Sequence, residues 1–287
     1  MTGAPGTGKS SLVNQLALHY RKKEDKRIAI VAVDPSSPFT GGAVLGDRVR
    51  MRDLSGDPNV FIRSMASRGS LGGLAQATAN MVQVFDAAGF DIIIVETVGA
   101  GQSEVDIARL AHTTLVVEAP GLGDDIQAIK AGILEIADIL VVNKADRPGV
   151  ENTEKALKTM LELAHPAERI FKHHGVSMKV EAPKQKQTTI MWIPPIQRTV
   201  STEGVGIHEL ADAIARHVAH LRLSGDWALR ERTRLEVELE ALIREGLMNK
   251  FKEEMKAKAY ENMLESVIQR KVSPWEAAAV LMNGRQP

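Results

Sequence analysis

The sequence predicts an α/β fold, with a mainly parallel sheet flanked by helices and a C-terminal helical arm. Apolar, β-branched runs alternate with helical patterns along the first two thirds of the chain, as in consecutive strand–helix–strand units. Hydrophobic residues make up 44% of the chain and aromatic residues only 4%, so aliphatic side chains must form the core. The runs at 92–95 and 139–142 are uninterrupted, as expected of strands buried on both faces.

The alternating patterns place the elements of this fold along the chain. Strands are predicted at 27–34, 60–63, 90–97, 114–119, 139–143 and 189–194, and helices at 10–23, 71–88, 125–136, 150–163 and 207–221. The segment 165–186 is polar, with His173, His174 and a Lys-Gln-Lys run, and is predicted to be a surface insertion. We therefore assign residues 1–225 to one α/β domain.

The last part of the chain, residues 226–287, has a different pattern. Apolar residues recur four apart among mixed charges, which predicts a long amphipathic helix. They are Leu235, Leu239, Ile243, Leu247, Phe251 and Met255. Ser273 followed by Pro274 predicts the cap and first turn of a final helix. We interpret this part as a helical arm whose apolar stripe packs on its own domain, forms a homodimer seam, or does both.

Charge and composition exclude several classes of function. The 36 basic and 36 acidic residues cancel, which argues against nucleic acid or an anionic membrane as partner. The chain has no cysteine, so disulfides and thiolate metal sites are excluded. No apolar run reaches the ~20 residues of a membrane span, and no signal-peptide pattern opens the chain. We expect a cytoplasmic protein.

The first motif with a chemical meaning is Gly3-Ala4-Pro5-Gly6-Thr7-Gly8-Lys9-Ser10, which matches G-x-x-x-x-G-K-[ST]. Glycines let backbone N–H groups surround a phosphate, Lys9 reaches the terminal phosphates, and the Ser10 hydroxyl binds Mg²⁺. Ser11 continues into a predicted helix, whose positive end favours phosphate. Only Met1 and Thr2 precede this P-loop, so the strand that normally comes before it is missing or replaced.

The second motif, Asn143-Lys144-Ala145-Asp146, matches the N-K-x-D signature of GTPases and follows a predicted buried strand. The Asp146 carboxylate can accept hydrogen bonds from the guanine N1–H and amino group, which adenine cannot offer together. The segment with Ser201, Thr202 and Glu203 stands where GTPases place a second base-holding loop, and a simple strand-to-helix turn is the alternative.

Candidate metal ligands and switches come from two further segments. Glu96 closes a buried strand and precedes Gly99 and Gln102, an arrangement typical of a segment that responds to the γ-phosphate. Asp34 and Asp47 flank a glycine-rich segment and either approach the metal and the attacking water or cap local turns.

These segments resemble the MeaB/ArgK family of P-loop GTPases. The similarity rests on 34–51, on 96–104 and on 119–132, which contains Asp124, Gln127 and Lys130. The resemblance implies catalytic and magnesium roles for Asp34, Asp47 and Glu96 beside Lys9 and Ser10. It also implies coupling of Asp124, Gln127 and Lys130 to a partner, and dimerisation through the arm.

The function implied by this resemblance is that of a slow GTPase chaperone for a cobalamin-dependent acyl-CoA mutase, with methylmalonyl-CoA mutase as the expected partner. GTP/GDP and Mg²⁺ are the expected ligands, and cobalamin enters only through the partner. Two alternatives remain: an ArgK-like phosphotransferase acting on a protein or small acceptor, and a nucleotide-independent mutase-binding subunit. A nickel-insertion GTPase is disfavoured, since His- and Cys-rich metal stretches are absent from the sequence.

Overall fold

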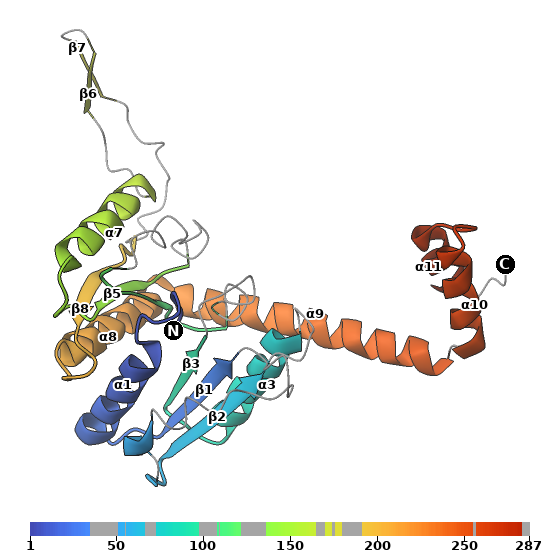
Figure 1. The fold of residues 1–287 in the computed structure, drawn as a ribbon, viewed down its shortest axis with the longest axis horizontal. Coiled ribbons are helices and arrows are strands. Elements are labelled where there is room, and N and C mark those ends of the chain that lie inside the picture. The colour runs from blue at the N-terminus through green and yellow to red at the C-terminus, as the bar shows by residue number, and fades with distance from the viewer. Residues whose placement is uncertain are drawn as a thin grey trace. The chain divides into compact units, whose positions relative to one another are not determined.

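The computed structural model confirms the α/β fold with parallel strands and C-terminal helices (Figure 1). It describes residues 1–34, 51–54, 56–66, 73–97, 108, 110–121, 136–164, 170–173, 176–179, 191–254 and 257–282. Chain contacts divide these residues into two units, Met1–Arg232 and Thr233–Pro287. Among the described helices, none combines the length and apolar character that crossing a membrane requires.

Six parallel strands form the core of the first unit. One sheet has the order β2-β1-β3 and the other β4-β5-β8. Their bounds are Val60–Ala66 for β2, Ile28–Asp34 for β1, Ile92–Glu96 for β3, Leu115–Glu118 for β4, Ile139–Asn143 for β5 and Ile196–Thr199 for β8. All four pairings within these sheets are parallel, so the strands end at a common carboxyl edge.

Met1 and Thr2 lie between the two sheets. Thr2 pairs in parallel with Val116, because its N–H donates to the Leu115 carbonyl at 2.9 Å and its carbonyl accepts from Val117 at 2.8 Å. On the other side, the Thr97 N–H donates to the Met1 carbonyl at 3.0 Å. These two residues therefore hold the place of the strand that was expected before the P-loop, and they lead directly into that loop.

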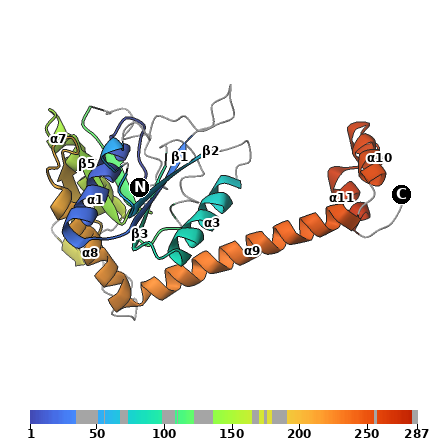
Figure 2. The same ribbon diagram turned by 90° about the horizontal axis from the view of Figure 1, so that it is seen from below.

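Helices cover both faces of the strands. They are α1 (Lys9–Glu24), α3 (Gly73–Ala87), α7 (Val150–Ala164) and α8 (Ile207–Ser224), with a short 3-10 turn, η1, at Arg52–Leu54. Figure 2 shows α1 and α3 on opposite sides of the strands. Alternation explains this: Ile28 and Ile30 of β1 pack with α1, while Val31 and Val33 pack with Phe85 of α3.

One prediction about the region before α8 needs correction. The strand predicted at 189–194 is wrong, since 191–195 have no regular structure and β8 begins at Ile196. Pro194 and Pro195 lack amide donors, so the parallel ladder can start only after them. The predicted insertion contains a two-stranded antiparallel sheet, β6 (Ile170–His173) with β7 (Val176–Lys179). Of the helix predicted at 125–136, residues 125–135 lie outside the described residues.

The C-terminal helices are α9 (Asp226–Glu254), α10 (Ala257–Ile268) and α11 (Pro274–Met282). α11 starts with a reciprocal cap, in which the Glu276 N–H donates to Ser273 Oγ at 3.2 Å and the Ser273 N–H donates to the Glu276 carboxylate at 2.9 Å. Four members of the predicted apolar stripe on α9 are each at least half exposed in the single chain. They are Leu235, Leu239, Ile243 and Leu247.

Candidate nucleotide site

The P-loop lies at the carboxyl edge of the strands, between Thr2 and α1. Gly3, Gly6 and Gly8 have φ angles of 140°, 84° and 91°, which residues with a side chain rarely adopt. Space excludes side chains as well, since a Cβ on Gly3 would lie 2.1 Å from the Val117 carbonyl oxygen and a Cβ on Gly8 2.5 Å from the amide nitrogen of Asn143. The motif's glycines therefore fit a loop that is pressed against two strands.

Lys9 folds back across this loop. Its ammonium group is buried and donates to the carbonyls of Gly3 at 2.7 Å and Ala4 at 3.0 Å. Lys9 is also the first residue of α1, where unpaired N–H groups and the helix dipole favour an anion. A charged donor and a helix start thus meet at the place where phosphates are expected.

Ser10 and Glu96 meet at the end of β3. The Ser10 hydroxyl donates to the Glu96 carboxylate at 2.6 Å, and both side chains are buried. A hydroxyl and a carboxylate are the oxygen donors that Mg²⁺ prefers, and Mg²⁺ normally takes few protein ligands beside phosphate oxygens and water. This donor pair fits Mg²⁺, and no cluster of three metal-binding side chains occurs within the described residues.

Asn143 joins the two nucleotide motifs. At the end of β5 its side-chain amide donates to the Thr7 carbonyl of the P-loop at 2.8 Å. Its oxygen accepts from the Ser201 hydroxyl at 2.6 Å, the Ser201 N–H at 3.2 Å and the Thr199 hydroxyl at 3.1 Å. One buried amide therefore holds three loops in a fixed relation, which supports placing both motifs in one site.

Lys144 and Asp146 follow on the same loop. Lys144 has a φ of 56°, and its ammonium group donates to the Gly6 carbonyl at 2.6 Å. The Ala145 N–H donates to the Thr199 carbonyl at 3.0 Å, which fixes the backbone of this loop against β8. The Asp146 side chain is exposed, so its carboxylate is open to a base.

The third loop held by the Asn143 amide contains the predicted residues Ser201, Thr202 and Glu203. It connects β8 to α8, and of its candidate residues only Ser201 is buried, by the contacts with Asn143. Thr202 and Glu203 are exposed on the turn. Thr199 was missing from the predicted site, although its hydroxyl binds the same amide. Its place at the end of a strand, two residues before Ser201, is the signal that could have identified it.

The remaining predicted residues are not placed by these contacts. The backbone of Asp34 ends β1, the strand paired with β3, and its side chain is not described. Asp47, Gly99, Gln102, Asp124, Gln127 and Lys130 lie outside the described residues. Pro5 is exposed on the P-loop and Ser11 is half-buried in the first turn of α1, so the roles of all these residues stay predictions.

Comparison with known proteins agrees with this geometry. Residues 1–256 match the family model described as "Methylmalonyl Co-A mutase-associated GTPase MeaB". The chain belongs to the MeaB family. This membership makes it a P-loop GTPase, with GTP as its nucleotide, and confirms the resemblance found in the sequence.

Individual relatives extend the match beyond the family model. A Pyrococcus horikoshii protein whose name describes it as an inferred GTPase is 46% identical over 282 residues, covering 98% of this MeaB-family chain and 82% of the relative. The mouse mitochondrial homologue of methylmalonic aciduria type A is 31% identical, covering 98% of this chain and 64% of that protein. A crystal structure of a protein named LAO/AO transport system kinase is 26% identical, with a TM-score of 0.65, covering all of this chain and 80% of its own.

Proposed function

We propose that this MeaB-family chain binds Mg·GTP at the carboxyl edge of its strands and uses slow hydrolysis to gate the loading and protection of a cobalamin-dependent acyl-CoA mutase. The observation that carries the nucleotide part is the Asn143 amide, which unites the P-loop with the N-K-x-D loop. The mutase part is supported by the family description and by the name of the mouse relative. A mutase of the methylmalonyl-CoA type is the expected partner.

The phosphate, metal and base contacts have separate roles in this proposal. The loop N–H groups and Lys9 bind the β- and γ-phosphates, which take the ammonium group from the carbonyls that it now contacts. Ser10 and Glu96 hold Mg²⁺, which, when bound, neutralises charge that develops on the phosphates. Asp146 selects guanine. Asp34 and Asp47 are proposed to complete the metal shell and to orient the attacking water.

Partner coupling is assigned to Gly99, Gln102, Asp124, Gln127 and Lys130. These residues follow β3 and β4, whose ends flank the P-loop. Lys130→Ala should leave basal GTP turnover unchanged and remove its acceleration by the mutase. An acceleration equal to that of the unaltered chain would dismiss Lys130 as a coupling residue.

Homodimerisation is proposed through the arm, whose apolar stripe is exposed in the single chain. An exposed row of this kind is typical of a surface that another chain covers. Replacing Leu239 and Ile243 by Glu should give monomers by sedimentation, whereas exchanging exposed Arg244 for Gln on the same helix should not. A dimer that survives both Glu substitutions would place the interface elsewhere.

Turnover of γ-labelled GTP with and without methylmalonyl-CoA mutase tests the central proposal. We expect slow release of labelled phosphate, faster release with mutase, and cobalamin transfer that depends on the nucleotide. Label that moves to a protein or small acceptor would favour the phosphotransferase, a function that the kinase name of the solved relative suggests. Mutase binding that is identical with GDP, GTP or neither would leave only the binding-subunit alternative.

A further inference from the structure

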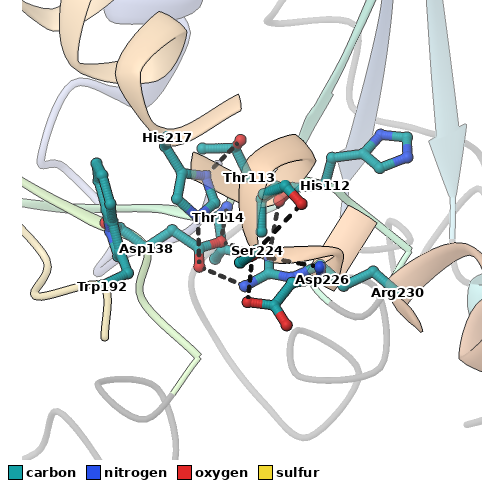
Figure 3. A network of polar contacts seen from close by, with 10 residues as sticks. His112, Thr113, Thr114, Asp138, Trp192, His217, Ser224, Asp226 and Arg230 are labelled. Carbon is teal, nitrogen blue, oxygen red and sulfur yellow. Dashed lines mark hydrogen bonds and ion pairs between the residues drawn. The ribbon is translucent and has the colours of Figure 1, made fainter. Parts of the chain in front are cut away.

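A cluster of charged and polar groups lies just before β4 and β5, at the opposite end of these strands from the nucleotide loops. Figure 3 shows its side chains. We call Thr114, Asp138, His217 and Arg230 the Asp138 cluster. The Asp138 carboxylate accepts from the two terminal nitrogens of Arg230 at 2.9 and 2.8 Å and from the Thr114 N–H at 2.7 Å. His217 Nε2 lies 3.2 Å from the same carboxylate. The cluster therefore joins two strands to α8 and α9.

Electrostatics hold this cluster together. Burial alone would raise the pKa of Asp138, but hydrogen bonds from His217 and Arg230 hold that pKa below its ordinary value. The hydrogen bond with Asp138 in turn raises the pKa of Arg230. The side chains of Asp138 and His217 are 9% and 1% exposed, while Arg230 is 37% exposed, so the ion pair is open to water only on the arginine side.

The first turns of α9 make further contacts around this pair. Arg230 also donates to the His112 carbonyl at 2.7 Å. The His112 ring stacks on Trp227, with 3.8 Å between ring centres, and its Nε2 contacts the Glu231 carboxylate. The start of α9 is thus bound to the residues immediately before β4 as well as to the residue before β5.

The segments after β3 and after β4, which contain the candidate switch residues, lead to the residues that contact Arg230. The chain leaves β3 at the nucleotide edge, passes through Gly99 and Gln102, and arrives at 112–114. It leaves β4 at that edge, passes through 122–135, and arrives at Asp138. A rearrangement of either segment at the nucleotide must therefore be absorbed within the segment or displace a residue that contacts Arg230.

We propose that Arg230 is a positioning residue that couples the nucleotide state of the site to helix α9. The proposal rests on the proposed function, because it requires GTP and GDP to change the segments after β3 and β4. A bidentate guanidinium–carboxylate pair has a fixed geometry, so α9 follows a displacement of Asp138. Coupling of this kind requires an element whose equilibrium both sites bias, and we assign that role to α9.

Hydrogen exchange of the full chain tests the coupling. Peptides across 226–240 are followed with GDP and with a non-hydrolysable GTP analogue, for the unaltered chain, for Arg230→Gln and for Arg244→Gln. Arg244 is an exposed arginine on the same helix, so its substitution controls for the lost charge. Affinities for both nucleotides are measured first, and a chain that binds neither would overturn the proposed function and this inference together.

In the unaltered chain and in Arg244→Gln, we expect exchange at the start of α9 to differ between the two nucleotides by about fivefold or more, the lower end of common coupling. Arg230→Gln should raise exchange in both states and abolish the difference, while both nucleotides still bind. A purely structural role would raise exchange equally and preserve the difference, which would overturn the proposal. So would an unaltered chain that binds both nucleotides and shows no difference.

A second variant protects the test against misfolding. Arg230→Gln leaves the Asp138 carboxylate without its guanidinium partner, which can unfold a chain for reasons unrelated to coupling. Asp138→Asn combined with Arg230→Gln removes both charges, and a cooperative thermal transition establishes that this chain folds. Loss of the nucleotide-dependent difference is again expected, and its retention in the double variant would overturn the coupling role.

Discussion

The two ends of the parallel strands are held by different chemistry. At the carboxyl end, the neutral Asn143 amide joins three loops, and the ammonium groups of Lys9 and Lys144 contact loop carbonyls at 2.7 and 2.6 Å. At the amino end, the Asp138 carboxylate and the Arg230 guanidinium form a bidentate pair. In the first set both ammonium groups contact carbonyl oxygens, while in the second a carboxylate and a guanidinium group pair with each other.

We therefore call the carboxyl end of the strands the exchangeable end and the amino end the fixed end. A phosphate attracts an ammonium group more strongly than a carbonyl does, so Lys9 can change partners when a nucleotide binds. Removing Arg230 instead leaves the buried Asp138 carboxylate without its guanidinium partner, which is costly. The carboxyl end should therefore respond to ligands, and the amino end should respond to pH.

The largest expected effect is at the exchangeable end. Lys9→Ala should weaken GTP binding on the order of 100-fold, because charge-assisted hydrogen bonds to the phosphates are lost. Titration with a fluorescent GTP analogue measures the affinity, and Lys158→Ala on the exposed face of α7 is the matched control. An affinity unchanged by Lys9→Ala would mean that phosphates bind elsewhere.

Asn143→Ala tests the neutral contacts of that end. It should lower the free energy of unfolding by about 2 kcal/mol, because the Thr7 carbonyl and the hydroxyls of Thr199 and Ser201 lose a buried partner. Urea denaturation measures this, with exposed Asn152→Ala as control. Equal stability of the two variants would show that the three loops hold together without this amide.

Asp146→Asn separates base recognition from stability. The exposed carboxylate contributes little to folding, so we expect unfolding to be unchanged while the preference for GTP over ATP falls by about tenfold. Competition between the two nucleotides measures the preference, and Asp86→Asn on the exposed side of α3 serves as control. A preference that survives would remove Asp146 from base recognition.

The smallest effect is expected at the fixed end. Because the pKa of Asp138 is lowered in the fold, its stabilisation is complete above the ordinary aspartate value of 3.8 and is lost as pH falls below it. Asp138→Asn should cost about 1 kcal/mol at neutral pH, a low figure because Arg230 is partly solvent-screened. The free energy of unfolding, measured by urea denaturation from pH 3 to pH 7, should also fall less steeply towards acid pH in the variant. An equal fall in both chains would contradict the lowered pKa of Asp138.

Much of this site could be predicted because its motifs are local in sequence. The glycines of the P-loop, the lysine and serine after them, and Asn143 at the end of an apolar run all require particular residue types at short spacing. Periodicity of apolar residues likewise predicted the buried strands and the long helix of the arm. The strand predicted at 189–194 was wrong because its apolar residues suggested a ladder that Pro194 and Pro195 cannot enter.

Sequence by itself determined the α/β class, the order of the nucleotide motifs and the family, since each follows from residue type at short range. Only the tertiary structure decided that Thr199 shares the Asn143 amide, and that Asp138 pairs with Arg230, 92 positions further along the chain. Those contacts depend on which strands become neighbours and where α8 and α9 pack against them. A periodic pattern specifies the face that a helix buries, but not the partner that its charged residues meet there.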